Sequence, residues 1–273
     1  MITFSRVRRT AVRVTLAAIL LVPAVAGAQD FLWTGTVARG NWVRTRNMNG
    51  GIVVEQATGD RVEVTAIKKA SRGGDTSVVK IELRQSPGGG DVIVCAIWDN
   101  QGTCDEDGYS SGRRNNRRWS DDESERRNVS VEFRVKLPAG VRLDASTVNG
   151  GIEITGATSE VRASSVNGGN RASSSVGPVR ANTVNGGIDV RMGTFTGSEE
   201  LSYSTVNGSV KVRLPENANA DIELSTVNGS LESAFPITMQ GRLDRHHIRA
   251  RLGSGGPRLT FSTVNGSVEL MKL

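Results

Sequence analysis

The sequence predicts an all-β fold of the β-solenoid or β-helix type, a stack of short strands with repeats of ~18–22 residues. The first observation is a phrase, Val-Asn-Gly followed by Gly or Ser, whose six copies in the C-terminal half are 18, 18, 22, 21 and 37 residues apart. The second is the alternation of apolar and polar residues on both sides of each copy, which is typical of strands. The third is composition: 32 Gly residues, only 4% aromatic residues and no convincing helical periodicity favour a narrow, regularly stacked β core.

The repeated phrase predicts a corner in the chain. Apolar residues stand six and four positions before each Asn, and in five of the six copies another stands three positions after it. Because the parity of the inward positions changes, the chain must turn or bulge at the phrase. Asn-Gly suits a two-residue hairpin turn, and it also suits a solenoid corner whose Asn side chains stack along the axis. The near-identity of the copies favours the solenoid, since a hairpin turn would tolerate Asp-Gly or Gly-Gly.

We therefore expect a structural ladder of turns along one edge of the stack. A variant phrase with Met in place of Val extends this ladder toward the N-terminus. A buried ladder would make the interior variant Asn185→Ala less stable by on the order of 1–3 kcal/mol. The predicted ladder and turn residues are Asn49, Asn149, Gly150, Asn167, Gly168, Asn185, Gly186, Asn207, Gly208, Asn228, Gly229, Asn265 and Gly266.

Residues 1–28 are predicted to be a secretory signal peptide. Four arginines precede a short apolar run from Leu16 to Val22, and Ala26-Gly27-Ala28 provides a cleavage site of small residues. We expect export to the periplasm, the cell surface or the medium. Without this leader 30 basic residues stand against 28 acidic ones, and the net charge falls from +6 to +2. A nucleic-acid partner is therefore not expected.

Residues 29–273 are predicted to form a single β-repeat domain with three parts. Residues 129–273 hold the regular coils, and residues 99–128 form a charged insertion, expected to be a solvated loop. Residues 29–98 would be diverged N-terminal coils that cap the stack, with strands at 42–55, 61–67, 78–83 and 91–98.

Two features near the C-terminus break the regular pattern. Residues 233–256 interrupt the period, and we expect a hairpin-like excursion through Ile248, Ala250 and Leu252. The final strand, 267–273, has no later coil to cover it. It is predicted to be an open pairing edge unless the excursion shields it.

The two cysteines, Cys95 and Cys104, are nine residues apart and flank a Gly turn. In an exported protein this spacing predicts a disulfide, because two thiols alone do not make a metal site. Asp105-Glu106-Asp107-Gly108 resembles part of a calcium loop but lacks the later bidentate Glu, so no metal site is predicted. The only histidines, His246-His247, are neighbours on a strand and point to opposite faces, which excludes joint chelation.

Carboxylates recur one residue inside the strand that follows each corner, and they keep a polysaccharide-acting enzyme as a minor alternative. These residues are Glu153, Asp189, Glu232 and Glu269, and the same column holds Arg171 and Lys211. Mixed charge on an outward face serves solubility, so no catalytic residue is predicted. An arginine cluster with an aromatic residue in the insertion is largely neutralised by adjacent acids; it comprises Arg113, Arg114, Arg117, Arg118 and Trp119.

Three stretches carry a resemblance to a known family. They are VEFRVKLPAGVRLDASTVNGGIEI within residues 129–154, the repeated TVNGGI and STVNGSV phrases, and GGPRLTFSTVNGSVEL at 255–270. Together they resemble the bacterial "putative adhesin" family, a β-strand-repeat domain of unknown function. The resemblance implies an exported, β-solenoid-like domain of the cell envelope without established catalytic residues.

The expected function is that of a non-enzymatic envelope protein, an adhesin or a structural interaction module, with no cofactor. Its partner would be an envelope or surface component, either protein or glycan, bound along the regular faces of the stack. The principal alternative is self-association through open strand edges, which would make the protein a self-assembling scaffold.

Overall fold

The computed structural model describes residues 31–71, 73–86, 90–98, 102–106, 108–110, 128–195, 199–239 and 244–273. The predicted signal peptide, most of the predicted insertion and its arginine cluster lie outside the described residues. The described chain is all-β apart from a single 3-10 turn, η1 (Thr76–Val78). No helix among these residues is long and apolar enough to cross a membrane.

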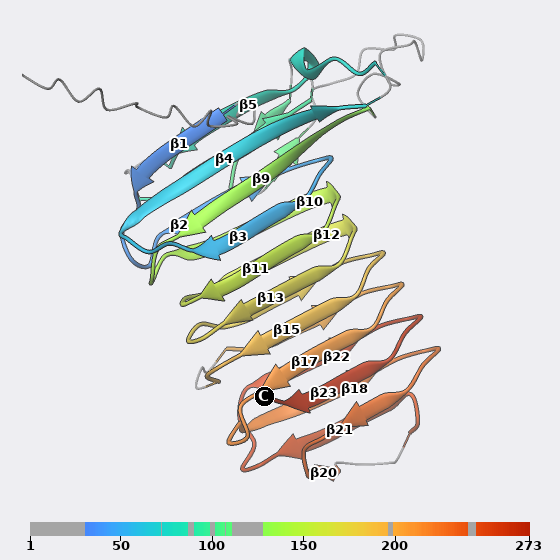
Figure 1. The fold of residues 1–273 in the computed structure, drawn as a ribbon. Helices are drawn as coiled ribbons and strands as arrows, with labels where there is room; N and C mark the ends of the chain where they lie inside the picture. The colour runs from blue at the N-terminus through green and yellow to red at the C-terminus, as the bar shows by residue number, and fades with distance from the viewer. Residues whose placement is uncertain are drawn as a thin grey trace, which may run out of the picture.

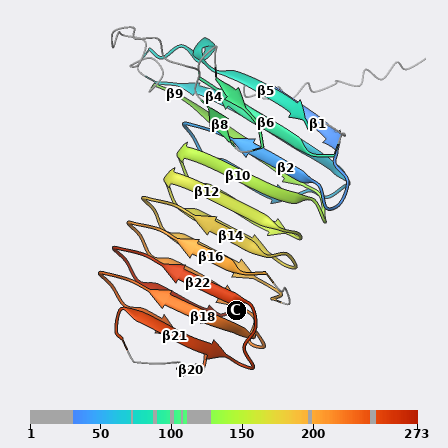
Figure 2. The ribbon, with the colours of Figure 1, turned by 180° about the vertical axis from the view of Figure 1, so that it is seen from behind.

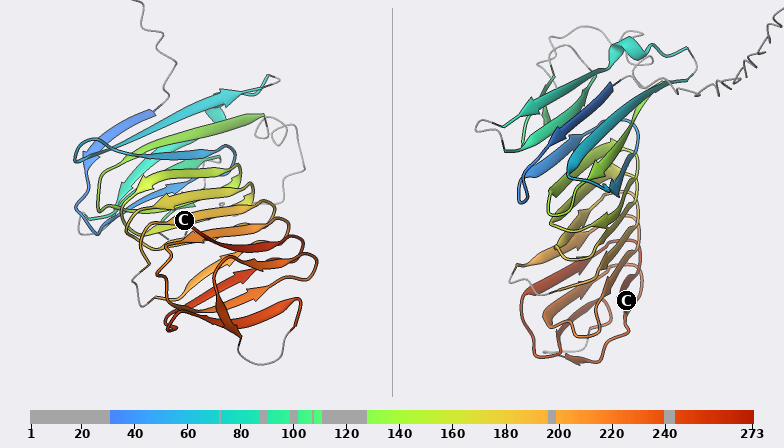
Figure 3. Two further views of the ribbon diagram at one scale, coloured as in Figure 1. Left: turned by 60° about the horizontal axis from the view of Figure 1, so that its bottom comes forward. Right: turned by 60° about the vertical axis from the view of Figure 1, so that its left-hand side comes forward.

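Two long sheets lie face to face and form a flattened solenoid (Figures 1 and 3). The front sheet of Figure 1 has, in spatial order, β1 (Phe31–Thr36), β4 (Arg61–Ala70), β9 (Val129–Leu137), β3 (Ile52–Gln56), β11 (Ile152–Ala157), β13 (Asn170–Ser174), β15 (Ile188–Met192), β17 (Val210–Leu214), β23 (Val268–Lys272) and β19 (Leu231–Ser233). The back sheet, which faces the viewer in Figure 2, has β20 (Ile237–Met239), β21 (His247–Leu252), β18 (Ala220–Ser225), β22 (Arg258–Ser262), β16 (Leu201–Ser204), β14 (Val179–Asn182), β12 (Val161–Asn167), β10 (Arg142–Asn149), β2 (Trp42–Arg46), β6 (Val92–Ile97) and β5 (Lys80–Gln85).

Each regular coil contributes one strand to the back sheet, turns at Val-Asn-Gly and contributes the next strand to the front sheet. Successive coils pair in parallel, as β10 does with β12 and β11 with β13. The alternating pattern directs Leu143 and Ala145 inward from one sheet and Ile152 and Ile154 from the other, and all four are buried. Parallel pairing excludes the hairpin interpretation of Val-Asn-Gly. The predicted β-solenoid class is confirmed.

The N-terminal end of the stack differs from the predicted run of diverged coils. Only β2 and β3 form a coil, and Asn49 lies opposite Asn149 as the predicted ladder requires. The pairs β1–β4, β4–β9 and β5–β6 are antiparallel instead. Reversal of strand direction ends the parallel stack, and Lys80, Glu82 and Arg84 on the outermost strand β5 discourage further pairing.

The C-terminal end corrects a second expectation. Strand β23 does not form an open edge, because it pairs in parallel with β17 on one side and β19 on the other. In the back sheet β22 likewise lies between β16 and β18 (Figure 2). The last coil therefore lies between two coils that precede it in the sequence. The excursion forms the antiparallel pair β20–β21, and β21 covers the outer edge of β18.

Candidate functional site

The row of corners on the right of Figure 1 is the most regular surface of the molecule, and we call it the Val-Asn-Gly edge. Along it the side-chain amide of each Asn donates to the amide oxygen of its neighbour at 2.7–2.9 Å. The spatial order of this ladder is Asn49, Asn149, Asn167, Asn185, Asn207, Asn265 and Asn228. The ladder lies on the surface: six of its seven side chains are exposed and Asn49 is half-buried, whereas a buried ladder had been expected.

A second ladder, which the sequence analysis did not identify, runs inside the same corners. Two residues before the Asn of each of the six Val-Asn-Gly copies stands a buried Thr or Ser, and five of these six hydroxyls donate to a Gly carbonyl of the adjacent coil at 2.8–2.9 Å. Ser165 is the exception, since it donates to Gly168 of its own coil and approaches Thr183. The sequence does carry a signal for this second ladder, because a Thr or Ser stands two residues before the Asn in every copy of the phrase.

The glycine of the phrase is required by close approach between coils. A Cβ atom on Gly208 would lie 2.1 Å from the carbonyl oxygen of Gly186, and Gly208 has φ of +154°. The same carbonyl oxygen of Gly186 accepts the hydrogen bond from the Thr205 hydroxyl. The corner therefore packs backbone against backbone, held by hydroxyls from inside and by amides from outside.

The valines of the phrase project outward and form an exposed apolar column beside the Asn ladder. Exposed apolar residues are ordinary when isolated, but a contiguous row marks an interaction surface. The exposed fraction is 39–40% for five of them and 60% for the sixth, in the order Val148, Val166, Val184, Val206, Val264 and Val227.

On the front-sheet side of the ladder a shallow groove of about 530 Å³ crosses six coils. Its floor includes Gly151, Gly169 and Gly187, which have no side chain to fill it. Five residues of the predicted charged column line it, in the spatial order Glu153, Arg171, Asp189, Lys211 and Glu269, and the sixth, Glu232, follows Glu269 in the column. Because β23 of the last coil lies between β17 and β19, Glu269 rather than Glu232 is next to Lys211.

Ion pairs occupy part of this charged column. Lys211 contacts Glu269 at 2.7 Å, and Arg213 pairs with Asp189. Both carboxylates therefore face a cationic side chain. The column therefore presents charges of alternating sign from Glu153 to Glu269 and ends on a second acid, Glu232.

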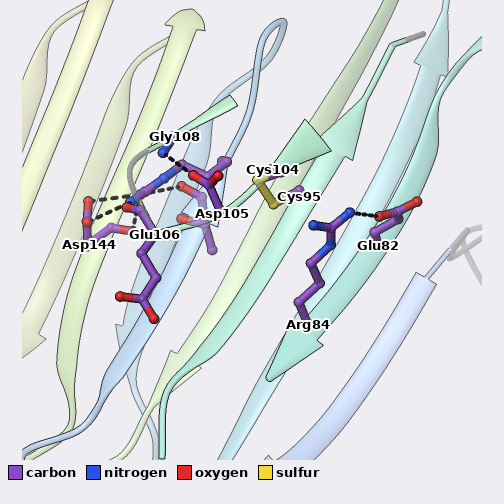
Figure 4. Close-up of a disulfide and its surroundings, with 10 residues drawn as sticks. Glu82, Arg84, Cys95, Cys104, Asp105, Glu106, Gly108 and Asp144 are labelled. Carbon is purple, nitrogen blue, oxygen red and sulfur yellow. Dashed lines mark hydrogen bonds and ion pairs between the residues drawn. A yellow bond between two sulfur atoms is a disulfide. The ribbon is translucent and has the colours of Figure 1, made fainter. Parts of the chain in front are cut away.

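Cys95 and Cys104 form a disulfide in the structure (Figure 4). It fixes the small hairpin of β7 (Thr103–Cys104) and β8 (Tyr109–Ser110) against β6. Next to it Arg46 donates to both carboxylate oxygens of Asp144 at 2.9 and 2.7 Å and to the Glu106 carbonyl at 3.0 Å. The disulfide thereby holds the beginning of the charged insertion on the back sheet.

The acidic loop and the histidines are engaged in local contacts. The Asp105 carboxylate accepts from the Gly108 amide at 3.2 Å, and the Glu106 carboxylate accepts from the Ser86 hydroxyl at 2.6 Å. His247 lies 3.1 Å from the Glu223 carboxylate, while the His246 amide donates to Asp244. Within the described ranges no three His, Cys, Asp or Glu side chains are grouped to hold a metal ion.

An ion pair joins the first coil to the N-terminal end strands. Asp91, before β6, accepts from Arg44 at 2.6 Å and from the backbone N–H of Trp42 at 2.9 Å. Burial opposes ionisation of this carboxyl, but the Arg44 guanidinium and the Trp42 amide outweigh it and hold the pKa of Asp91 below its usual value. Trp42 in turn lies under the Arg162 guanidinium, 4.4 Å from its ring centroid.

A family model described as Toastrack DUF4097 matches residues 41–271. The chain belongs to this family. The match confirms the resemblance drawn from the repeated phrase, and it covers both the irregular N-terminal end of the Toastrack domain and its regular coils. No curated protein matches the chain significantly.

Two solved structures are similar to this Toastrack chain. One is described as a "putative cell adhesion protein" from Clostridium sporogenes, with a TM-score of 0.51, 10% identity, and coverage of 89% of this chain and 99% of that one. The other is described as a "putative adhesin" from Bacteroides fragilis, with a TM-score of 0.31, 9% identity, and coverage of 89% and 96%. At such identity the first likeness shows a shared fold.

Proposed function

We propose that this protein is an exported, non-enzymatic, adhesin-like module of the cell envelope that binds an extended surface component along the Val-Asn-Gly edge. The observation that carries the proposal is the continuity of that edge: one row of amides, one row of valines and one groove cross successive coils. Neighbouring strands are about 4.8 Å apart, so each contact is repeated at that interval along the stack. Such a surface suits a linear polymer, a glycan strand or an extended polypeptide, better than a compact small molecule.

The chemistry of the edge supports a partly polar, partly apolar ligand. Each interior amide uses one N–H and one acceptor position in the ladder, and an amide has two of each. The exposed side chains of Asn185 and Asn207 thus retain capacity to bind hydroxyl or peptide groups. The adjacent valines provide apolar contact for the same ligand, and the groove accommodates its width.

Export is supported by the leader-like residues 1–28 and by the disulfide. Disulfides persist in oxidising compartments such as the periplasm and the cell surface. The first test is fractionation of the native host, with protease accessibility measured on intact cells. Surface exposure supports adhesion, whereas a soluble protein protected within the envelope would contradict it.

The second test measures binding directly. Purified wild-type protein is expected to co-sediment with isolated envelopes of the host, and Val184→Asp/Val206→Asp is expected to lose this binding. The matched control is Val176→Asp, because Val176 is 63% exposed but does not belong to the edge. Equal binding by the edge variant and the control would assign the interaction to another surface.

The enzymatic alternative has a separate test. Because Glu269 and Asp189 are both ion-paired, no catalytic role is proposed for the charged column. Incubation with purified envelope glycans is expected to release no fragments. Release that disappears in Glu153→Gln or Glu269→Gln would reverse this conclusion.

A further inference from the structure

The last coil, β22 and β23, fills a slot in the stack. We define the slot as the space between β16 and β18 in the back sheet and between β17 and β19 in the front sheet. The last coil pairs in parallel with all four of these strands. Without it, two facing pairs of strand edges and the apolar interior between them would be open.

The contacts that hold this coil are the repeat contacts of the whole stack. Phe261 is fully buried and its ring stacks on Tyr203, with 5.2 Å between the centroids. On one side Thr263 donates to the Gly208 carbonyl and Asn265 to Asn207, both at 2.8 Å. On the other side Thr226 donates to the Gly266 carbonyl and Asn228 to Asn265, again at 2.8 Å. All are non-covalent, and none requires the coil and the slot to belong to one chain.

The tether between β21 and the last coil is short and glycine-rich. It is Gly-Ser-Gly-Gly-Pro, residues 253–257, and it passes the start of β18 to reach the slot. Within it Gly255 donates to the Leu252 carbonyl at 3.0 Å, and the Pro257 carbonyl accepts from the Asp221 amide at 3.2 Å. The Asn219 side-chain oxygen accepts from the amide and hydroxyl of Ser254 at 2.8 and 3.0 Å. The tether spans two strand spacings, about 10 Å, although five extended residues reach about 17 Å. It therefore has enough length to lead into a slot of a molecule that lies beside the same edge.

We propose that the slot accepts the last coil of a second copy of this chain, so that two copies exchange their C-terminal coils and each completes the stack of the other. Reciprocal exchange gives a closed dimer with two-fold symmetry. The exchanged dimer has the same hydrogen bonds and the same buried apolar residues as the monomer. It differs only in the path of residues 253–257, so dimer formation follows protein concentration.

The test uses two full-length variants, each with one added cysteine. Ser204 in β16 and Ser262 in β22 are register partners across the slot. Adjacent strands lie about 4.8 Å apart, within the Cα separation that a disulfide requires. Chains with Ser204→Cys and chains with Ser262→Cys are unfolded, mixed, refolded together and oxidised mildly. A disulfide between the two chains above the random background requires the last coil of one to occupy the slot of the other.

The expected result is a cross-linked heterodimer on non-reducing gels. While little dimer has formed, the fraction of chains in the heterodimer should rise about tenfold when the protein concentration is raised tenfold. The matched control is a mixture of Ser164→Cys and Asn182→Cys chains, register partners in two interior coils that are consecutive in the chain. It sets the background of random cross-linking. The double variant Ser204→Cys/Ser262→Cys verifies that the slot forms. A complete link within that double variant, with no heterodimer above background in the mixture, would overturn the proposal.

Discussion

The inner hydroxyl ladder, rather than the visible Asn ladder, is expected to be the stronger tie between coils. Thr205 is 5% exposed and donates to the Gly186 carbonyl at 2.9 Å. Thr205→Val keeps the shape of the side chain and removes the donor. Leaving a shielded carbonyl without its hydrogen bond costs about 1–3 kcal/mol, and the added methyl group returns up to about 0.8 kcal/mol. We expect a net loss of about 1–2 kcal/mol in the free energy of unfolding.

The outer ladder gives the comparison. Asn185→Ala removes two amide hydrogen bonds, to Asn167 and from Asn207, at 2.8 and 2.7 Å. These side chains are exposed, so water replaces the lost partners, and we expect a loss below about 1 kcal/mol. This is smaller than the loss predicted for a buried ladder, because the amides face solvent.

Both variants are measured by urea unfolding followed by circular dichroism, with thermal unfolding as a second readout. A loss of 1–2 kcal/mol corresponds to a fall in Tm of roughly 2–8 °C for a domain of this size. Ser202→Ala, an exposed change in the same strand as Tyr203, serves as control and should stay within about 0.5 kcal/mol. A larger loss for Asn185→Ala than for Thr205→Val would refute this assignment of the stronger tie.

Three further predictions concern the corner glycine, the Asp91 ion pair and the disulfide. Gly208→Ala forces a Cβ atom against the Gly186 carbonyl oxygen and should cost on the order of 3 kcal/mol or more in urea unfolding; a neutral result would contradict the backbone packing of the corner. The lowered pKa of Asp91 stabilises the fold above its unfolded pKa of about 3.9, and this stability is lost as pH falls through the folded pKa. Wild type should therefore lose more stability than Asp91→Asn between about pH 5 and 2, and parallel pH profiles would refute this role. Cys104→Ser should lower stability by about 2–3 kcal/mol, with wild type under reductant showing the same fall in Tm; a Tm unaffected by either change would count against the disulfide.

The repeat phrase was sufficient to predict the coils. The parity of the inward apolar positions changes at the phrase, and the copies are nearly identical. Together these two features predict stacked coils with parallel strands and place Asn149 opposite Asn167. The side of the corner on which each residue lies was harder to predict. Asn was expected inside and is outside, whereas the hydroxyl two residues earlier is buried. Alternation alone assigns Thr147 to the core, but its hydroxyl makes it a polar residue, and only its hydrogen bond to the Gly50 carbonyl of the adjacent coil accounts for its burial.

The order of the coils could not be obtained from the phrase. Because every coil carries the same corner, any coil can pair with any other, and sequence order is only the default. What places the last coil beside β16 is contact between particular side chains, such as Phe261 with Tyr203. The arrangement of the N-terminal end could not be predicted for another reason. The strands were recognised, but alternation is the same in parallel and antiparallel strands, so their direction was not predicted.

The position of the last coil makes the completed stack depend on residues 258–272. In a simple solenoid a chain cut short by one repeat would lose only its end, and the remaining coils would stay covered. Here a chain that stops before Arg258 lacks the piece that joins β16 to β18 and β17 to β19. Ribosomal products that terminate early would expose apolar surface and be open to degradation. The topology thus makes the covering of two earlier coils depend on residues 258–272.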